Sequence, residues 1–185
     1  MSVRLRPAEE FRDRAVTIAA AERERLRSLG VVGELVLTGG SSLPGALTRG
    51  DVDLHLRVRP VAFAAVVAVL RRTYVVVHPE IWAPTLATFG VPAALETGMA
   101  VTPAGSEHDL RFTRTWQLLA ADPALLGEYN AVKLAETADE TAYEDRKSAF
   151  FDRLLELWPI HPAARRPHPT DLPPRARPGQ DQNRP

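Results

Sequence analysis

Two aspartates separated by a single residue begin a stretch of alternating apolar and polar side chains. Because successive residues of a β-strand point to opposite faces, Asp51 and Asp53 are predicted to share one face of a strand over residues 51–58. His55 and Arg57 fall on the same face. Adjacent carboxylates repel each other, and a hard, oxygen-seeking ion such as Mg²⁺ relieves that repulsion better than Zn²⁺ in a chain without cysteine. The pair therefore predicts a magnesium site, with a solvated polar strand face as the alternative.

A glycine- and serine-rich loop precedes these acids. Gly39 and Gly40 permit positive φ angles and leave backbone N–H groups unshielded, while Ser41 and Ser42 add hydroxyl donors. We expect this loop to hold phosphate oxygens, with Arg49 as a further cationic contact; a simple turn is the alternative. Nucleotidyl transfer needs a phosphate-binding loop followed by an acidic strand, because the loop fixes the triphosphate and the metal offsets charge on the leaving group.

A third acid lies further along the chain. The segments Leu86–Phe89 and Leu95–Thr102 are predicted to pair as a β-hairpin. In the second segment Glu96 shares a face with Gly98 and Ala100. If that face also carries the two aspartates, Glu96 becomes a third metal ligand. The alternative is a glutamate that faces solvent at the edge of the sheet.

The chain contains two lysines, and every other basic side chain apart from histidine is arginine. Lys133 and Lys147 each follow a tyrosine by four residues, Tyr129 and Tyr143, and each lies within the apolar stripe of a predicted helix. A compact ammonium group at these places suits a catalytic role in which it neutralises charge on a triphosphate. In the alternative interpretation, both stems lie along the edge of the core and the amines reach water.

Helices and strands alternate around these residues. The pair Asp122–Pro123 is a strong helix start, because the aspartate caps free amides and proline is tolerated in the first turn. We expect one domain over residues 3–158, followed by a proline- and arginine-rich disordered tail over 159–185. Helices are predicted over 7–29, 61–72, from 122 onward and from about 139 to 158, and further strands over 31–38 and, as a buried strand, over 74–77.

Composition limits the classes of function. The 185 residues are 45% hydrophobic, which suits a globular domain with a real core. Lys and Arg number 23, as do Asp and Glu, so no net field favours nucleic acid or an anionic membrane as a partner. The longest apolar run, Val61–Leu70, is too short to span a bilayer, and the first residues lack the apolar segment of a signal peptide. A cytoplasmic location is expected.

The motifs together resemble the GrpB family, which is itself similar to a branch of the nucleotidyltransferase superfamily. The resemblance covers the chain up to Trp158. It implies an α/β (α+β) fold with a mixed sheet flanked by helices, and a metal ion at the acids. The similar motifs are the run from Gly39 to Gly45, the Asp51-Val52-Asp53 triplet, and the two Tyr-x-x-x-Lys pairs with Phe150 and Phe151.

Some positions depart from that family pattern. Gly40 stands where the family has the first serine of the loop, and alignment on the Pro-Gly pair puts His55 where a second acid often occurs. The family's histidine-rich strand and its Phe-Arg-Asp stretch are also missing. The histidine-rich strand is replaced by a segment with Thr97, Gly98 and Ala100. The Phe-Arg-Asp stretch is replaced by Thr115, Trp116 and Gln117.

These observations lead to two expectations. The first is a domain that binds a nucleoside triphosphate with Mg²⁺ and transfers a nucleotidyl group to an unidentified small-molecule or protein acceptor. The second, suggested by the departures, is a catalytically degenerate nucleotide- or protein-binding module of the same fold. Nucleic-acid binding through the arginine-rich tail ranks below both.

Overall fold

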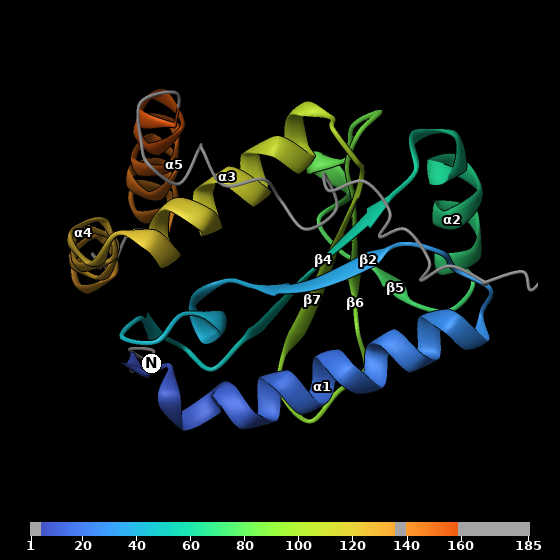
Figure 1. Cartoon of the computed structure of the whole chain (residues 1–185), viewed down its shortest axis with the longest axis horizontal. Coiled ribbons are helices and arrows are strands. Elements are labelled where there is room, and N and C mark those ends of the chain that lie inside the picture. The colour runs from blue at the N-terminus through green and yellow to red at the C-terminus, as the bar shows by residue number, and fades with distance from the viewer. Residues whose placement is uncertain (1–4, 136–139, 159–185) are drawn as a thin grey trace, which may run out of the picture.

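The computed structural model describes residues 5–135 and 140–158. Their main feature is a five-stranded sheet with the strand order β2-β4-β7-β6-β5 (Figure 1). β4 and β7 run parallel, and the other neighbours in the sheet are antiparallel. A short second sheet pairs β1 with β3. The strands are β1 Arg6–Pro7, β2 Glu34–Thr38, β3 Leu47–Thr48, β4 Val52–Val58, β5 Val75–Val76, β6 Ala87–Gly90 and β7 Thr97–Pro103.

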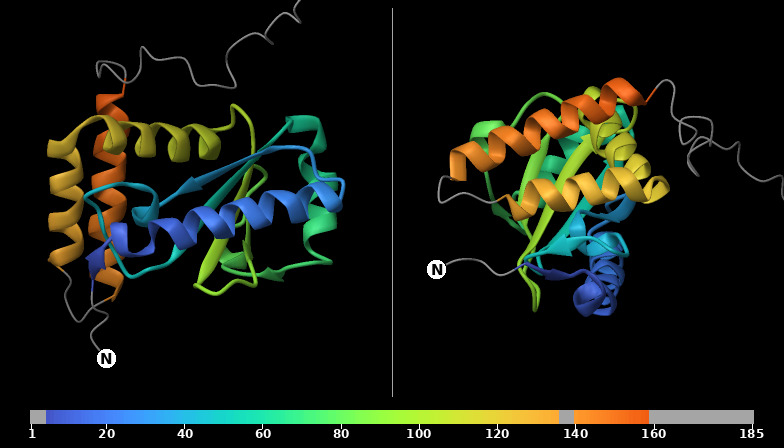
Figure 2. Two further views of the ribbon diagram at one scale, coloured as in Figure 1. Left: turned by 60° about the horizontal axis from the view of Figure 1, so that its bottom comes forward. Right: turned by 90° about the vertical axis from the view of Figure 1, so that its left-hand side faces the viewer.

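The two faces of the five-stranded sheet meet different helices. α1 and α2 cover one face, where Leu54 and Leu56 join a hydrophobic core with Ala19 and Leu70. α3 packs against the other face, and a second core around Leu118 unites α3, α4 and α5, which lie together at one end of the molecule (Figures 1 and 2). The helices are α1 Glu9–Ser28, α2 Phe63–Leu70, α3 Glu107–Ala121, α4 Pro123–Leu134 and α5 Glu140–Leu157.

The predicted mixed sheet flanked by helices is confirmed. Along β4 the side chains alternate as expected, with Val52 and Leu54 in the core and His55 and Arg57 toward α3. The predicted hairpin is β6 paired with β7. Asp122 caps α4, where its carboxylate accepts hydrogen bonds from two backbone N–H groups.

Two local predictions are wrong. The buried strand over 74–77 is the short edge strand β5, in which Val75 is 71% exposed. Pro7 belongs to β1 and not to the first turn of α1. The helices predicted from the sequence do not include α3, which begins at Glu107, where the Ser106 side chain caps its first turn.

Some predictions fall outside the described residues. The tail over 159–185 and the side chain of Tyr143 lie there. Within the part of the chain that the structure describes, no helix is long and apolar enough to cross a membrane.

Candidate functional site

A pocket of about 630 Å³ opens on the face of the sheet that also meets α3. It lies among β4, β7, the loop after β2 and the three C-terminal helices. Charged groups that are far apart in the sequence line it together, among them Arg49, Asp51, Asp53, Glu96, Lys133 and Lys147. Aromatic side chains line it as well, namely Phe112, Trp116, Tyr129 and Phe151.

Asp53 is the most strongly perturbed acid of the pocket. Burial and the nearby charge of Asp51 raise its pKa to about 6, although Lys147 and Lys133 act in the opposite direction. Gly39 lies directly against this carboxylate, since a Cβ added at Gly39 would stand 1.8 Å from Asp53 Oδ2. The backbone of Gly39 has φ 72° and ψ −176°, a region that only glycine adopts readily. The predicted flexible glycine is therefore required at this position, for packing as well as for conformation.

The loop hydroxyls donate to backbone oxygens of the chain. Ser41 Oγ donates to the backbone oxygen of Asp51, and Ser42 Oγ donates to the backbone oxygen of Gly39 at 2.7 Å. Thr48 Oγ1 donates to Asp51 Oδ1 at 2.9 Å. The serines thus hold the shape of the loop, whereas Gly40 lines the pocket itself.

Residues of α1 and α4 fix the same loop from outside. Asn130 accepts a hydrogen bond from the N–H of Leu47 and donates to the carbonyl of Gly45, each at 2.8 Å. On the α1 side, Arg12 donates to the carbonyl of Ser42 at 2.9 Å. The sequence prediction missed these contacts, because a polar residue on a helix gives no signal of the backbone group that it will meet.

Lys133 lies beneath the glycine loop. Its Nζ donates to the carbonyl of Leu47 at 2.7 Å and stands 4.5 Å from the centroid of the Tyr129 ring. Burial lowers its pKa to about 8, although Asp51 and Asp53 act to raise it. A Cβ on Gly40 would stand 2.8 Å from this Nζ. The glycine at position 40, a departure from the GrpB pattern, therefore leaves room for the ammonium group.

Lys147 reaches the pocket from α5, and Arg49 reaches it from the loop before β4. Lys147 is partly buried, and its charge acts to lower the pKa of Asp53. The structure thus brings both lysines, Arg49 and both aspartates to one pocket. Their parts in phosphate and metal binding stay predictions.

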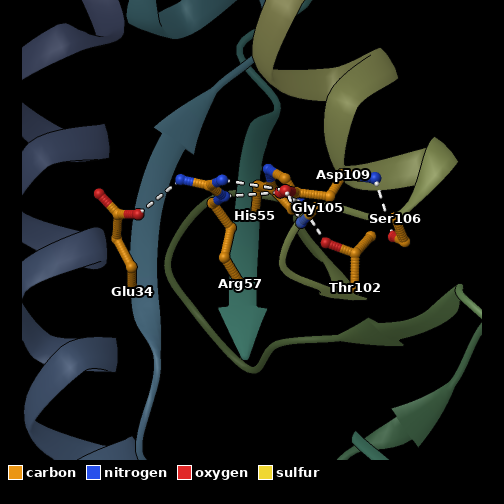
Figure 3. A network of polar contacts seen from close by, with 7 residues as sticks. All are labelled: Glu34, His55, Arg57, Thr102, Gly105, Ser106 and Asp109. Atoms are coloured by element: carbon orange, nitrogen blue, oxygen red, sulfur yellow. Dashed lines mark hydrogen bonds and ion pairs between the residues drawn. The ribbon is translucent and has the colours of Figure 1, made fainter. Parts of the chain in front are cut away.

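Arg57 does not neutralise the two aspartates but joins a separate buried network (Figure 3). It donates to both oxygens of Asp109, at 2.6 and 2.9 Å, and to Glu34 at 2.9 Å. Burial alone would raise the pKa of Asp109, but the hydrogen bonds from Arg57 and from the N–H of Gly105 outweigh it and hold that pKa below its ordinary value.

His55 connects this network to the pocket. It is 1% exposed, its Nε2 lies 2.8 Å from Thr102 Oγ1, and its ring lies 5.0 Å from the ring of Phe112. Nε2 also lies 3.7 Å from Asp109 Oδ1. His55 is thus packed among α3 and β7 side chains.

Glu96 lies directly before β7 and lines the pocket on the predicted side of the sheet. The parallel register pairs Asp53 with Gly98 and His55 with Ala100, so the strand positions alternate as expected. Glu96 itself is exposed at the rim of the pocket. Within residues 5–135 and 140–158, no three acidic or histidine side chains come close enough to hold a metal ion together. A part for Glu96 in metal binding stays a prediction.

Comparisons with known proteins support the fold. No protein-family model and no curated protein matches this chain. Among solved structures, the conserved protein GrpB from Enterococcus faecalis is similar, with a TM-score of 0.60 and 13% sequence identity over 78% of this chain and 94% of that one. At this identity the likeness concerns the fold alone. The chain therefore has a GrpB-like α+β fold, and its chemistry must be argued from its own residues.

Proposed function

We propose that this chain binds a nucleoside triphosphate together with Mg²⁺ in the pocket and transfers its nucleotidyl group to an acceptor. One observation carries the proposal: Asp51 and Asp53 line the same pocket as Lys133 and Lys147, although about 80 residues separate the acids from the first lysine. Paired carboxylates suit a divalent cation, and ammonium groups suit phosphate oxygens.

The acids fit Mg²⁺ by their chemistry. Their oxygens are the hard donors that this ion takes in small number, with water and substrate phosphate completing its shell. The raised pKa of Asp53 reflects burial and repulsion from Asp51, and a cation offsets both effects. When bound, Mg²⁺ would polarise the phosphate oxygens and offset negative charge in the transition state.

The other residues have separate parts. Lys147 and Arg49 attract the triphosphate by charge. The ammonium group of Lys133 has three N–H donors, and one of them donates to the carbonyl of Leu47. Lys133 therefore holds the loop and also offers a hydrogen bond to phosphate. Gly40 lets the chain approach the phosphates closely, because it carries no side chain.

The test is calorimetric titration of the protein with ATP, GTP, CTP and UTP, each with Mg²⁺ and again with EDTA. We expect binding that depends on Mg²⁺ and falls at least tenfold in the Asp51→Asn/Asp53→Asn variant. Asp152→Asn is the matched control, because Asp152 is an exposed acid on α5 that contacts Arg111. Absence of binding to any of the four nucleotides, or equal binding by the double variant, would contradict the proposal.

A second candidate function is a nucleotide-binding module without catalysis. Two observations favour it: the serine hydroxyls donate to backbone oxygens of the chain, and no three-ligand metal cluster forms among the described residues. Transfer of label from α-³²P nucleotides to a metabolite pool or to protein, with release of pyrophosphate, separates the two. Binding without any transfer supports the module.

A further inference from the structure

The pocket has a second side that carries no charge. Phe112 and Trp116 line it from α3, and Phe151 lines it from α5. All three rings are only partly buried, so each packs inward and also offers surface to the pocket. The rings of Trp116 and Phe151 lie edge to face, with centroids 6.0 Å apart. This cluster, which we call the aromatic wall, has no part in the metal and phosphate chemistry proposed above.

The aromatic wall adjoins the charged side through one shared residue. The Tyr129 ring lies 5.9 Å from that of Trp116 and 5.7 Å from that of Phe151, and it also lies under Lys133 Nζ. A ligand that places phosphate near Lys133 therefore has an aromatic surface one ring away.

The floor of the pocket beside Asp53 carries small residues. β7 places Gly98 next to Asp53 and Ala100 next to His55, and β6 places Gly90 next to Gly98. A Cβ built on Gly98 meets no atom within 4 Å. Small residues on three adjacent positions leave the sheet surface accessible, and a planar group fits between such a floor and a wall of rings.

We propose that the aromatic wall and the Gly98–Ala100 floor form a base-binding subsite, in which the nucleobase of the bound triphosphate stacks on Trp116. The inference rests on the proposed function, because it assigns the part of the ligand that lies next to the phosphates. Stacking needs only a π face, so every base binds, and purines bind more tightly than pyrimidines because their rings are larger.

The experiment compares ATP with inorganic tripolyphosphate, which has the phosphates and no base, in the presence of Mg²⁺. Trp116→Ala should lower the affinity for ATP about tenfold or more and leave the affinity for tripolyphosphate unchanged. Trp116→Phe should keep most of the affinity for ATP. Trp158→Phe is the matched control, since that ring packs against Arg114 and does not line the pocket.

Trp116 also packs against Tyr129 and Phe151, so its removal could disturb the packing of the helices. A variant that blocks the floor sterically tests the subsite without changing that packing. Gly98→Val puts a β-branched side chain into open space on a strand without a positive φ at that residue, so the fold should persist. It should weaken ATP binding at least fivefold and spare tripolyphosphate. In a protein with Trp82→Phe and Trp158→Phe, the fluorescence of the remaining Trp116 should be quenched by ATP and not by tripolyphosphate.

The outcomes distinguish failure of the base-binding subsite from failure of the proposed triphosphate and Mg²⁺ binding. Failure of both ATP and tripolyphosphate to bind wild type with Mg²⁺ overturns both. If tripolyphosphate binds as tightly as ATP, or if Trp116→Ala and Gly98→Val weaken both ligands equally, the base-binding subsite is wrong while the phosphate and metal site stands.

Discussion

Two groups of charged side chains lie on the same face of β4, and they differ in how well each acid is compensated. Near the end of the strand, Arg57 donates to both oxygens of Asp109 and the pKa of that buried acid falls below its ordinary value. At the start of the strand, Asp53 has two lysines in electrostatic range, yet its pKa rises to about 6.

The difference lies in geometry and in net charge. Asp109 meets a planar guanidinium that matches its two oxygens, and it also accepts from the N–H of Gly105 at 2.7 Å. Asp53 is desolvated beside a second acid, and Gly39 presses against it. The compensated pair fixes α3 to the sheet, whereas the acid at the start of β4 is the one to which the proposed function assigns the cation.

Breaking the compensated pair should have the largest effect. Asp109→Ala removes the carboxylate that accepts two hydrogen bonds from the buried Arg57 guanidinium, so the free energy of unfolding should fall by about 3–5 kcal/mol. Urea denaturation at pH 7 measures it. The double variant Arg57→Met/Asp109→Leu is the control and should recover most of the loss, because no buried charge then remains unpaired. A loss below about 1 kcal/mol in the single variant would contradict a structural role.

The glycine loop should show a smaller and graded effect. Gly39→Ala forces a side chain into a backbone region that only glycine adopts readily, 1.8 Å from Asp53 Oδ2, and should cost about 2–3 kcal/mol. Thermal and urea unfolding measure the change.

Gly40→Ala is the matched control for this loop. Its new Cβ would meet Lys133 Nζ at 2.8 Å, and that ammonium group is the mobile end of a long side chain. We expect a cost of about 1 kcal/mol or less, together with weaker triphosphate binding. Equal costs at the two glycines would contradict the requirement for glycine at position 39.

The sequence was sufficient to place the acids but not their partners. The period of two along β4 puts Asp53 on the pocket face, and the same reasoning puts Gly98 beside it once β7 is a parallel neighbour. Arg57 falls on the same strand face as the aspartates, but it meets Asp109, 52 residues away. No local pattern specifies which acid a cation will reach, because that choice depends on how α3 docks.

The aromatic wall could not be predicted from the sequence for a related reason. Trp116 and Phe151 occur at helical spacing with core residues, so their pattern indicates packing and gives no sign that each ring also borders a pocket. The apolar run of β5 misled in the opposite direction. Its residues suit a buried strand, but the sheet ends there, and Val75 faces solvent.

The pH dependence of stability should distinguish Asp53 from Asp109. The folded-state pKa of Asp53, about 6, lies above the ordinary 3.8, so between these values the folded protein binds the proton that the unfolded chain has released. This acid therefore lowers the free energy of unfolding as pH rises through that window. Asp53→Asn removes this decline and should make the protein about 1–2 kcal/mol more stable at pH 7, less than the full linkage because attraction to the lysines is also lost.

Urea denaturation of wild type and Asp53→Asn at pH 4, 5, 6 and 7 checks this expectation without added metal. The gap between the two proteins should open between pH 4 and pH 6 and then stay constant, whereas the exposed-acid control Asp13→Asn should follow wild type throughout. Added Mg²⁺ should stabilise wild type at pH 7 and leave Asp53→Asn less affected, since a cation that binds only the folded state raises its stability. A parallel pH profile for Asp53→Asn and wild type would mean that Asp53 is as well compensated as Asp109, and the contrast between the two ends of β4 would then disappear.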